Sequence, residues 1–280
     1  MLFEQIDKDH CGHLSKAEMQ QLELKILKHV IKFCEENNIK YFLYYGTLLG
    51  AIREKGFIPW DDDVDIAMPR EDYDRFLKIY KDSDRYISTH IDKDKDYYLP
   101  FAKVYDNHTY LDERSTQRIP MGVYIDIFPI DAFDNSKLTY FLNKPKRGLI
   151  HCKIALIKKE SSLLIKLIIF LGRVITIGFP LNKSIHSMEK NLRNTPLNKS
   201  KKVGTVTEGL LPVRPFPYKC IEKTIDWPFE DIIAKVPAGY EEILEILYGD
   251  YMTPPPQKKR KTAHEKFFSG YKTEFDKKSL

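Results

Sequence analysis

The stretch that most constrains the fold spans residues 41–68 and reads YFLYYGTLLGAIREKGFIPWDDDVDIAM. Its first part, 41–45, is an apolar and aromatic run, which predicts a buried strand. Gly46 and Thr47 then predict a small turn, and 48–54 has the composition and spacing of a short helix. The chain is therefore expected to return from this helix into a second strand close to the first.

Four acids mark that return: Asp61, Asp62, Asp63 and Asp65. Apolar residues alternate with acidic or small ones over 63–68, which predicts a strand with Asp63 and Asp65 on the same face. Carboxylates this close repel each other unless a cation lies between them, and hard oxygen ligands suit Mg²⁺ or Mn²⁺. The alternative is a solvated acidic turn, because short acidic motifs are common. The order strand, Gly-Thr turn, short helix and acidic strand favours the metal site, since nucleotidyltransferase-fold enzymes use it to place a phosphate-binding turn beside a metal.

A second informative strand is expected at 122–131, where apolar residues alternate around Asp126. An isolated carboxylate in such a strand is costly to bury unless it is paired or bound to a metal. Asp126 is therefore our candidate for a third metal carboxylate. Asp131 is interpreted as a turn or capping residue. Lys103, on an expected strand at 101–105, either reaches a phosphate or faces solvent.

The segment at 46–76, GTLLGAIREKGFIPWDDDVDIAMPREDYDRF, resembles the motif of the LicD family of phosphotransferases. That family includes bacterial phosphorylcholine transferases and, more distantly, the fukutin-type alditol-phosphate transferases. Two further stretches match: GVYIDIFPIDAF at 122–133, and YGDYMTPPPQKKR at 248–260, followed by His264. The resemblance is weakest through the middle of the chain and is greatest to phosphorylcholine transferases that decorate teichoic acids.

The resemblance implies an α+β fold with a nucleotidyltransferase-like mixed β-sheet, flanking helices and a helical insertion. It implies metal-dependent transfer of phosphocholine from CDP-choline to a hydroxyl of a cell-surface glycan or teichoic acid precursor. Asp63, Asp65 and Asp126 are expected to be catalytic and to hold the metal, with Asp126 also accepting the hydroxyl proton. Two alternatives stay open: transfer of ribitol or glycerol phosphate from a CDP donor, and a non-enzymatic membrane-associated scaffold.

Residues that bind the donor are expected next to the metal. The helix that follows Gly46 and Thr47 offers backbone N–H groups to phosphate, and Arg53 is the nearest cation. Asp61 and Asp62 are expected to shape the turn or to support the ligands. The full expected set of substrate-binding residues is Gly46, Thr47, Arg53, Lys103 and His264.

Charge is distributed unevenly along the 280 residues. Residues 1–135 hold 18 Lys/Arg and 26 Asp/Glu, a net charge of −8, whereas 136–280 hold 27 and 14, a net charge of +13. The second half is expected to face an anionic partner such as a nucleotide, a phosphate-rich polymer or a membrane surface. No nucleic-acid motif is present, so no nucleic-acid partner is predicted. We divide the chain into a catalytic core at 1–135, a helical insertion at 136–195, and a part at 196–280 that completes the same domain.

The helical insertion contains an apolar run at 161–181, SSLLIKLIIFLGRVITIGFPL. Lys166 and Arg173 interrupt it, so a buried helix, or a helix in the membrane interface with snorkelling basic side chains, fits better than a spanning helix. An interfacial helix would suit a lipid-linked acceptor, which gives the hypothesis of peripheral membrane association.

The four cysteines form no C-x-x-C pair, which argues against structural zinc. With no apolar signal core at the N-terminus, the expected location is the cytoplasm, at the inner face of the membrane if that helix lies there.

Helices are expected at 15–36, 70–80 and 240–248. The first overlaps DKDHCGHLSKAE at 7–18, which matches part of an EF-hand calcium loop but has Cys11 at a ligand position. A capping box formed by Ser15 and Glu18 is the preferred interpretation of this stretch. The oligomeric state is left open by the sequence.

Overall fold

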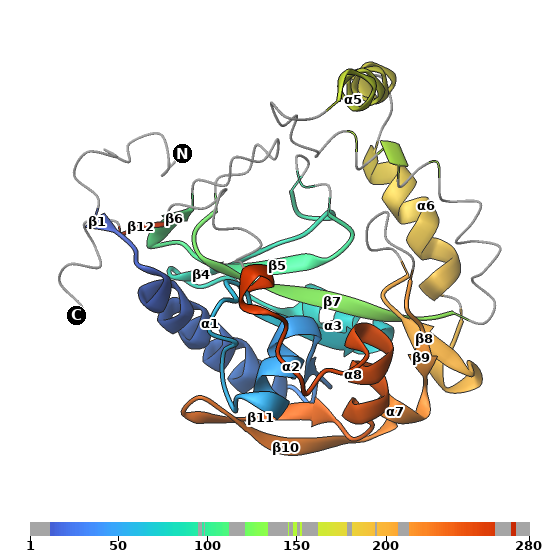
Figure 1. Cartoon of the computed structure of the whole chain (residues 1–280). Coiled ribbons are helices and arrows are strands. Elements are labelled where there is room, and N and C mark those ends of the chain that lie inside the picture. The colour runs from blue at the N-terminus through green and yellow to red at the C-terminus, as the bar shows by residue number, and fades with distance from the viewer. Residues whose placement is uncertain are drawn as a thin grey trace.

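The computed structural model describes residues 12–94, 97, 99–111, 121–133, 145, 148–149, 152, 162–177, 181–193, 195–206, 213–260 and 270–272. Its central sheet has the strand order β2-β3-β7-β5-β4, and β8 and β9 extend it from β7 (Figure 1). β3 and β7 run parallel, and the other pairs are antiparallel. The strands are β2 (Phe42–Leu43), β3 (Asp65–Pro69), β4 (Tyr86–Thr89), β5 (Ala102–Asp106), β7 (Tyr124–Ala132), β8 (Lys202–Gly204) and β9 (Phe216–Pro217). This is the α+β, nucleotidyltransferase-like mixed sheet with flanking helices that the sequence predicted.

Two helices cover the sheet, α1 (Lys16–Glu36) and α3 (Arg70–Ile79). They pack against each other through Phe33 and Phe76, whose ring centroids lie 5.7 Å apart, and their apolar residues join those of the strands in one buried core. α1 begins at the predicted capping box: the Glu18 N–H donates to Ser15 Oγ, and the Ser15 N–H donates to Glu18 Oε2 at 2.8 Å. The part of the calcium-like stretch before residue 12 lies outside the described residues.

A second group of elements packs around α2 (Tyr45–Arg53). The hairpin of β10 and β11 reaches α2 through Trp227, whose Nε1 donates to the Ala51 carbonyl at 2.9 Å. α8 ends at Gly249, which has a φ of 72°, a left-handed conformation that glycine adopts most easily. The remaining elements of this group are α7 (Lys219–Glu222), α8 (Tyr240–Tyr248), β10 (Thr224–Phe229) and β11 (Ile232–Pro237).

Two smaller regions complete the described chain. β1, β12 and β6 form a separate three-stranded sheet, while α5 stands away from the central sheet near one end of α6 (Figure 1). Within the described ranges, no helix combines the length and the apolar character that crossing a membrane requires. The bounds are β1 (Gly12–His13), β6 (Thr109–Leu111), β12 (Gly270–Lys272), α5 (Leu163–Ile177), α6 (Leu181–Arg193), η2 (Leu197–Lys199) and η3 (Gln257–Lys259).

The structure corrects three local predictions in the 41–68 stretch. The expected strand at 41–45 is only two residues long, because Tyr45 has a φ of 41° and turns the chain directly into α2. Gly46 and Thr47 therefore lie in the first turn of α2 and do not form a separate turn before it. The acidic strand begins at Asp65, so Asp63 belongs to the segment before β3 and does not alternate with Asp65 on the strand.

Candidate active site

Three charged residues lie in a row across three neighbouring strands. Asp65 of β3 is the register partner of Asp126 in the parallel β7, and Asp126 is in turn the partner of Lys103 in β5. Side chains of directly paired residues project from the same face of a sheet, and all three are buried. The structure therefore brings together two predicted metal carboxylates that are far apart in the sequence.

Lys103 holds one of these carboxylates in place. Its Nζ lies 2.5 Å from Asp126 Oδ1, and the same ammonium lies 3.4 Å from the centroid of the Tyr124 ring. The ring face of an aromatic side chain attracts a cation, so Lys103 is held both by the carboxylate and by the ring. Of the two roles considered for this lysine, solvent-facing neighbour is wrong, because the side chain is buried.

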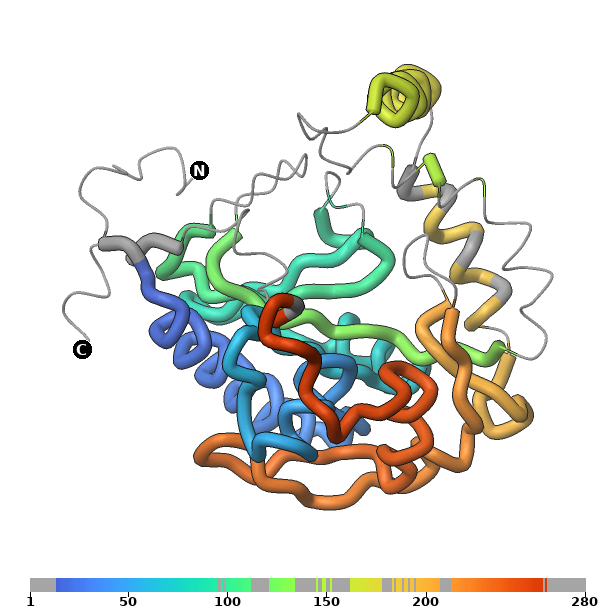
Figure 2. The backbone as a smooth tube through the Cα atoms, viewed as in Figure 1, coloured from blue at the N-terminus to red at the C-terminus, as the bar shows by residue number. Residues whose placement is uncertain are grey.

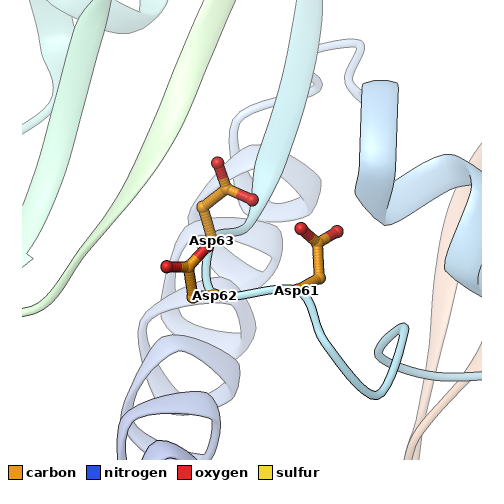
Figure 3. Close-up of side chains that lie close together, drawn as sticks. All are labelled: Asp61, Asp62 and Asp63. Atoms are coloured by element: carbon orange, nitrogen blue, oxygen red, sulfur yellow. The ribbon is translucent and has the colours of Figure 1, made fainter. Parts of the chain in front are cut away.

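The segment before β3 gathers three more carboxylates. Asp61, Asp62 and Asp63 each offer an oxygen, and these oxygens all lie within 4.8 Å of one another. Figure 3 shows the three side chains projecting from the segment that leads into β3, with α1 passing behind them. Burial raises the pKa of Asp61 above its usual range and the charge of Asp62 adds to this, whereas a hydrogen bond with Asp63 acts in the opposite direction. Such a group of oxygens suits a hard divalent cation.

α1 contributes a carboxylate that the sequence analysis missed. Glu23 is only 2% exposed, and its Oε2 has no hydrogen-bond partner among the described residues. Burial raises the pKa of Glu23 well above its usual range, and the charges of Asp63 and Asp62 raise it further. Gln20, one turn earlier, donates to the Asp61 carbonyl at 3.0 Å. The helical spacing indicates that Glu23 is buried, because it lies three and four residues before the buried apolar pair Ile26 and Leu27 and therefore on the same face of α1.

α2 holds the acids from the other side. The Asp65 N–H donates to Thr47 Oγ1 at 2.8 Å. Gly46 lies so close to the acidic segment that a Cβ added there would be 2.4 Å from Asp61 Oδ2. These two residues therefore fix the positions of Asp61 and Asp65, in addition to the phosphate-binding role that stays a prediction.

A cavity of about 390 Å³ adjoins this acidic group, between α2 and the segment at 248–255. Figure 2 shows that segment, in red, crossing the region of α2. Most of the wall opposite α2 is thus formed by residues some 200 positions later in the chain. The lining residues are Gly46, Leu49, Arg53, Ile58, Trp60, Asp61, Tyr248, Asp250, Tyr251, Thr253 and Pro255.

Arg53 is the basic residue of this cavity wall. Its Nη1 donates to the Tyr251 carbonyl at 3.1 Å, and its Nε donates to Glu54 at 2.8 Å. Its Nη2 is buried and has no acceptor within the described part of the chain. A buried cationic donor without an acceptor is costly, and an anionic group in the cavity would satisfy it.

Aromatic rings line the same cavity. The Trp60 ring centroid is 5.8 Å from the Arg53 guanidinium and 5.1 Å from that of Arg260. Tyr248 is 43% exposed and lines the cavity together with Asp61. Burial raises the pKa of the Tyr248 hydroxyl, and the charges of Asp65, Asp61 and Asp63 raise it further.

The structure does not confirm two further interpretations of the sequence, those of His264 and Asp131. His264 lies outside the described residues, so its expected role in binding stays a prediction. Asp131 is neither a turn nor a cap: it lies in β7 and accepts two hydrogen bonds from buried Arg70, from Nε at 2.7 Å and from Nη2 at 2.8 Å. Arg70 is the first residue of α3. The sequence pattern does not predict that the start of α3 lies beside Asp131.

Comparisons with known proteins connect this geometry to a family. A family profile described as "LicD/FKTN/FKRP, nucleotidyltransferase domain" matches residues 38–149. The chain is 32% identical over 269 residues to the lipopolysaccharide cholinephosphotransferase LicD of Haemophilus influenzae, covering 90% of this chain and 96% of that protein. The chain belongs to the LicD family.

Two uncharacterized rickettsial proteins match shorter parts of this LicD family chain. The protein from Rickettsia typhi is 33% identical over 135 residues, which covers 48% of the chain and 42% of that protein. The protein from Rickettsia prowazekii is 48% identical over 48 residues, which covers 17% and 18%. The LicD profile at 38–149 includes Asp65, Lys103 and Asp126, whereas the cavity wall at 248–255 lies beyond it.

Proposed function

We propose that this LicD family chain transfers phosphocholine from CDP-choline to a hydroxyl of a cell-surface glycan or teichoic acid precursor, in a metal-dependent reaction. The observation that carries the proposal is the group of half-buried carboxylates at Asp61, Asp62 and Asp63, beside a cavity that contains a buried arginine donor without an acceptor in the described chain. The name of the Haemophilus relative, a lipopolysaccharide cholinephosphotransferase, supports the group transferred and a glycan acceptor.

The carboxylates fit a divalent cation. Asp61, Asp62 and Asp63 offer oxygens that lie within 4.8 Å of one another, and Glu23 Oε2 is a buried oxygen near them without a partner in the described chain. Carboxylate oxygens are the ligands that Mg²⁺ and Mn²⁺ prefer. Asp63 would hold the cation together with Asp65 and Asp126, which lie on adjacent strands. The cation would neutralise charge on the donor pyrophosphate.

The chain's own residues then act on donor and acceptor. The oxygen of the acceptor hydroxyl bonds to the phosphorus that carries choline, the bond from that phosphorus to the bridging oxygen breaks, and CMP leaves. Asp126 accepts the hydroxyl proton, while Lys103 keeps this carboxylate in position through its contact at Oδ1. Arg53 Nη2 donates to a donor phosphate.

The cavity favours choline over an alditol as the transferred alcohol. Trp60, Tyr248 and Tyr251 present aromatic rings, and Asp61 and Asp250 add negative charge. Aromatic faces beside carboxylates bind quaternary ammonium groups through cation–π attraction. Ribitol or glycerol would instead require hydrogen-bond partners for several hydroxyls.

We propose the cytoplasm as the site of the reaction, where the three described cysteines would stay free thiols.

The test is CMP release from CDP-choline, measured with Mg²⁺ or EDTA and with or without a lipopolysaccharide or teichoic acid precursor as acceptor. We expect release to need Mg²⁺ and to be lost in Asp65→Asn and Asp126→Asn. The matched control is Asp231→Asn, which removes an exposed carboxylate paired with Lys28 on the surface. Binding of CDP-choline, followed by thermal shift, provides a readout that does not depend on finding the acceptor.

The same assay separates the alternatives. If CMP is released faster from CDP-ribitol or CDP-glycerol than from CDP-choline, the transferred alcohol is ribitol or glycerol and not choline. Trp60→Leu should raise the KM for CDP-choline more than the KM for these donors, and an equal effect would argue against the aromatic cavity as the choline site. If no donor releases CMP and no nucleotide shifts the melting temperature, the non-enzymatic scaffold is the better account.

A further inference from the structure

α5 exposes an unusually large apolar surface. Ten large apolar side chains on this 15-residue helix are between 48% and 84% exposed. Only a narrow stripe is covered, at Ile169, Gly172 and Thr176. At that stripe a Cβ added to Gly172 would lie 2.6 Å from Cys152 Sγ, so the helix rests closely on residue 152.

The apolar side chains surround most of the helix. A helix that is apolar around most of its circumference belongs in a protein core or in lipid, and exposed patches of this kind mark sites of interaction. Figure 1 shows α5 standing apart from the sheet, so the core of this chain does not cover it. The exposed residues are Leu163, Leu164, Ile165, Leu167, Ile168, Phe170, Leu171, Val174, Ile175 and Ile177.

Length decides how such a helix could meet lipid. Fifteen residues make a helix about 22 Å long, whereas the hydrocarbon core of a bilayer is about 30 Å thick. α5 is therefore too short to span a bilayer along its axis. A helix that lies in the interface, with its apolar side chains among the acyl chains, has no such length requirement.

Charge indicates which surface would attract it. Residues 144–193 hold 11 Lys/Arg and only two acids, Glu160 and Glu189. No acid occurs between 161 and 188, and Glu189 is buried beside Arg193 and Arg70. The sequence on either side of α5 is thus strongly basic, which complements the negative surface of anionic lipid.

We propose that α5 docks the protein on an anionic membrane by lying in the lipid interface. Lys166 extends toward the phosphate groups while the apolar side chains enter the acyl region. Arg173 stays on the covered side of α5, where its Nε donates to the Cys152 carbonyl at 3.3 Å. This surface is separate from the acidic group and its cavity, so the proposal does not depend on which donor the enzyme uses. It brings the protein to the surface where a lipid-linked acceptor would be held.

The test is sedimentation of the full chain with vesicles of phosphatidylcholine, alone or mixed with phosphatidylglycerol. We expect binding to the mixed vesicles that weakens at high salt. We expect it to be lost in Ile168→Gln/Phe170→Gln/Ile175→Gln. The matched control, Ile225→Gln/Ile233→Gln, changes exposed apolar residues of the β10–β11 hairpin and should bind like the native chain.

A second variant measures how deeply α5 enters the lipid bilayer. Phe170→Trp places a tryptophan on the exposed part of α5, and its added fluorescence should shift to the blue and be quenched by lipids brominated in the upper acyl chain. Vesicle binding that is absent, or unchanged in the triple variant, would overturn the proposal. Self-association removed by the triple variant, with no vesicle binding, would assign this surface to a second copy of the chain.

Discussion

Lys103 and Asp126 face each other across β5 and β7, with Nζ 2.5 Å from Oδ1 and both side chains almost fully buried. Removing one partner of a buried ion pair leaves the other charge without compensation, which typically costs about 3–5 kcal/mol. We therefore expect Lys103→Met to lower the free energy of unfolding by about that amount, as measured by urea denaturation.

The double variant Lys103→Met/Asp126→Leu tests the reason for this loss. It should recover much of the stability, because no unpaired charge remains. Costs that simply add would show that the two residues act independently. Lys28→Met serves as the control, because its pair with Asp231 is exposed and should be worth about 1 kcal/mol or less.

Gly46→Ala should separate stability from activity. The added Cβ would overlap Asp61 Oδ2, so the carboxylate must move, while replacing glycine by alanine stabilises by about 0.4–1 kcal/mol because it restricts the unfolded chain. We expect an unchanged or higher melting temperature together with CMP release slowed by about 100-fold. Gly204→Ala is the control, since its Cβ would make ordinary contacts of 3.4 Å or more. Full activity in Gly46→Ala would mean that the position of Asp61 does not matter.

Glu23→Gln should stabilise the metal-free protein. The substitution keeps the shape of a buried side chain whose pKa is raised well above its usual range, first by burial and then by the charges of Asp63 and Asp62. Folding the native chain at neutral pH must therefore either bury the charge of Glu23 or protonate it, and Gln removes that cost. In EDTA at neutral pH we expect a higher melting temperature, by about 2–4 °C for each kcal/mol removed.

Added Mg²⁺ should then raise the melting temperature less in Glu23→Gln than in the native chain. The control is Glu36→Gln, an exposed acid at the end of the same helix. A Glu23→Gln protein that melts lower in EDTA would show that this carboxylate has a stabilising partner.

His29 should make stability depend on pH. It lies against the rings of Tyr86 and Tyr80, and burial, together with the charge of Lys32, lowers its pKa, with Glu36 acting in the opposite direction. The folded state therefore favours the neutral ring, whereas the unfolded chain takes up a proton near pH 6.5. Stability should be fully present above that pH and should fall as the pH drops toward the lower folded pKa.

His29→Phe is the variant that checks this, because it keeps an aromatic ring and removes the titration. The free energy of unfolding of the native chain, relative to His29→Phe, should be higher at pH 8 than at pH 5.5. A constant difference across that range would exclude His29 as a source of the pH dependence.

Local patterns predicted local structure well. The capping box at Ser15 and the helix at Tyr240–Tyr248 occur where the spacing placed them. The alternation around Asp126 identified its strand, but the register of Asp126 with Asp65 depends on parallel pairing across 60 residues, which no local pattern specifies. The spacing of α1 places Glu23 on the apolar face with Ile26 and Leu27, but it does not show that the acidic segment before β3 packs over that face.

The cavity could not be predicted because its walls come from distant parts of the chain. The charge and position of Arg53 predict a phosphate ligand, but its guanidinium is held by the Tyr251 carbonyl, which comes from a distant part of the chain. The segment at 248–255 has no periodic pattern, and only its resemblance to a family motif singled it out. Its position beside α2 results from the packing of α8 and the β10–β11 hairpin, which is a property of the folded chain.

The late position of that cavity wall also affects when the site can form during synthesis. A growing chain carries Asp61, Asp62, Asp63, Asp65 and Asp126 once residue 126 has been made. The cavity wall opposite α2 is incomplete until Pro255 has left the ribosome and α8 has packed against α2. A product cut short before residue 248 would therefore keep those five carboxylates and lack the cavity beside them.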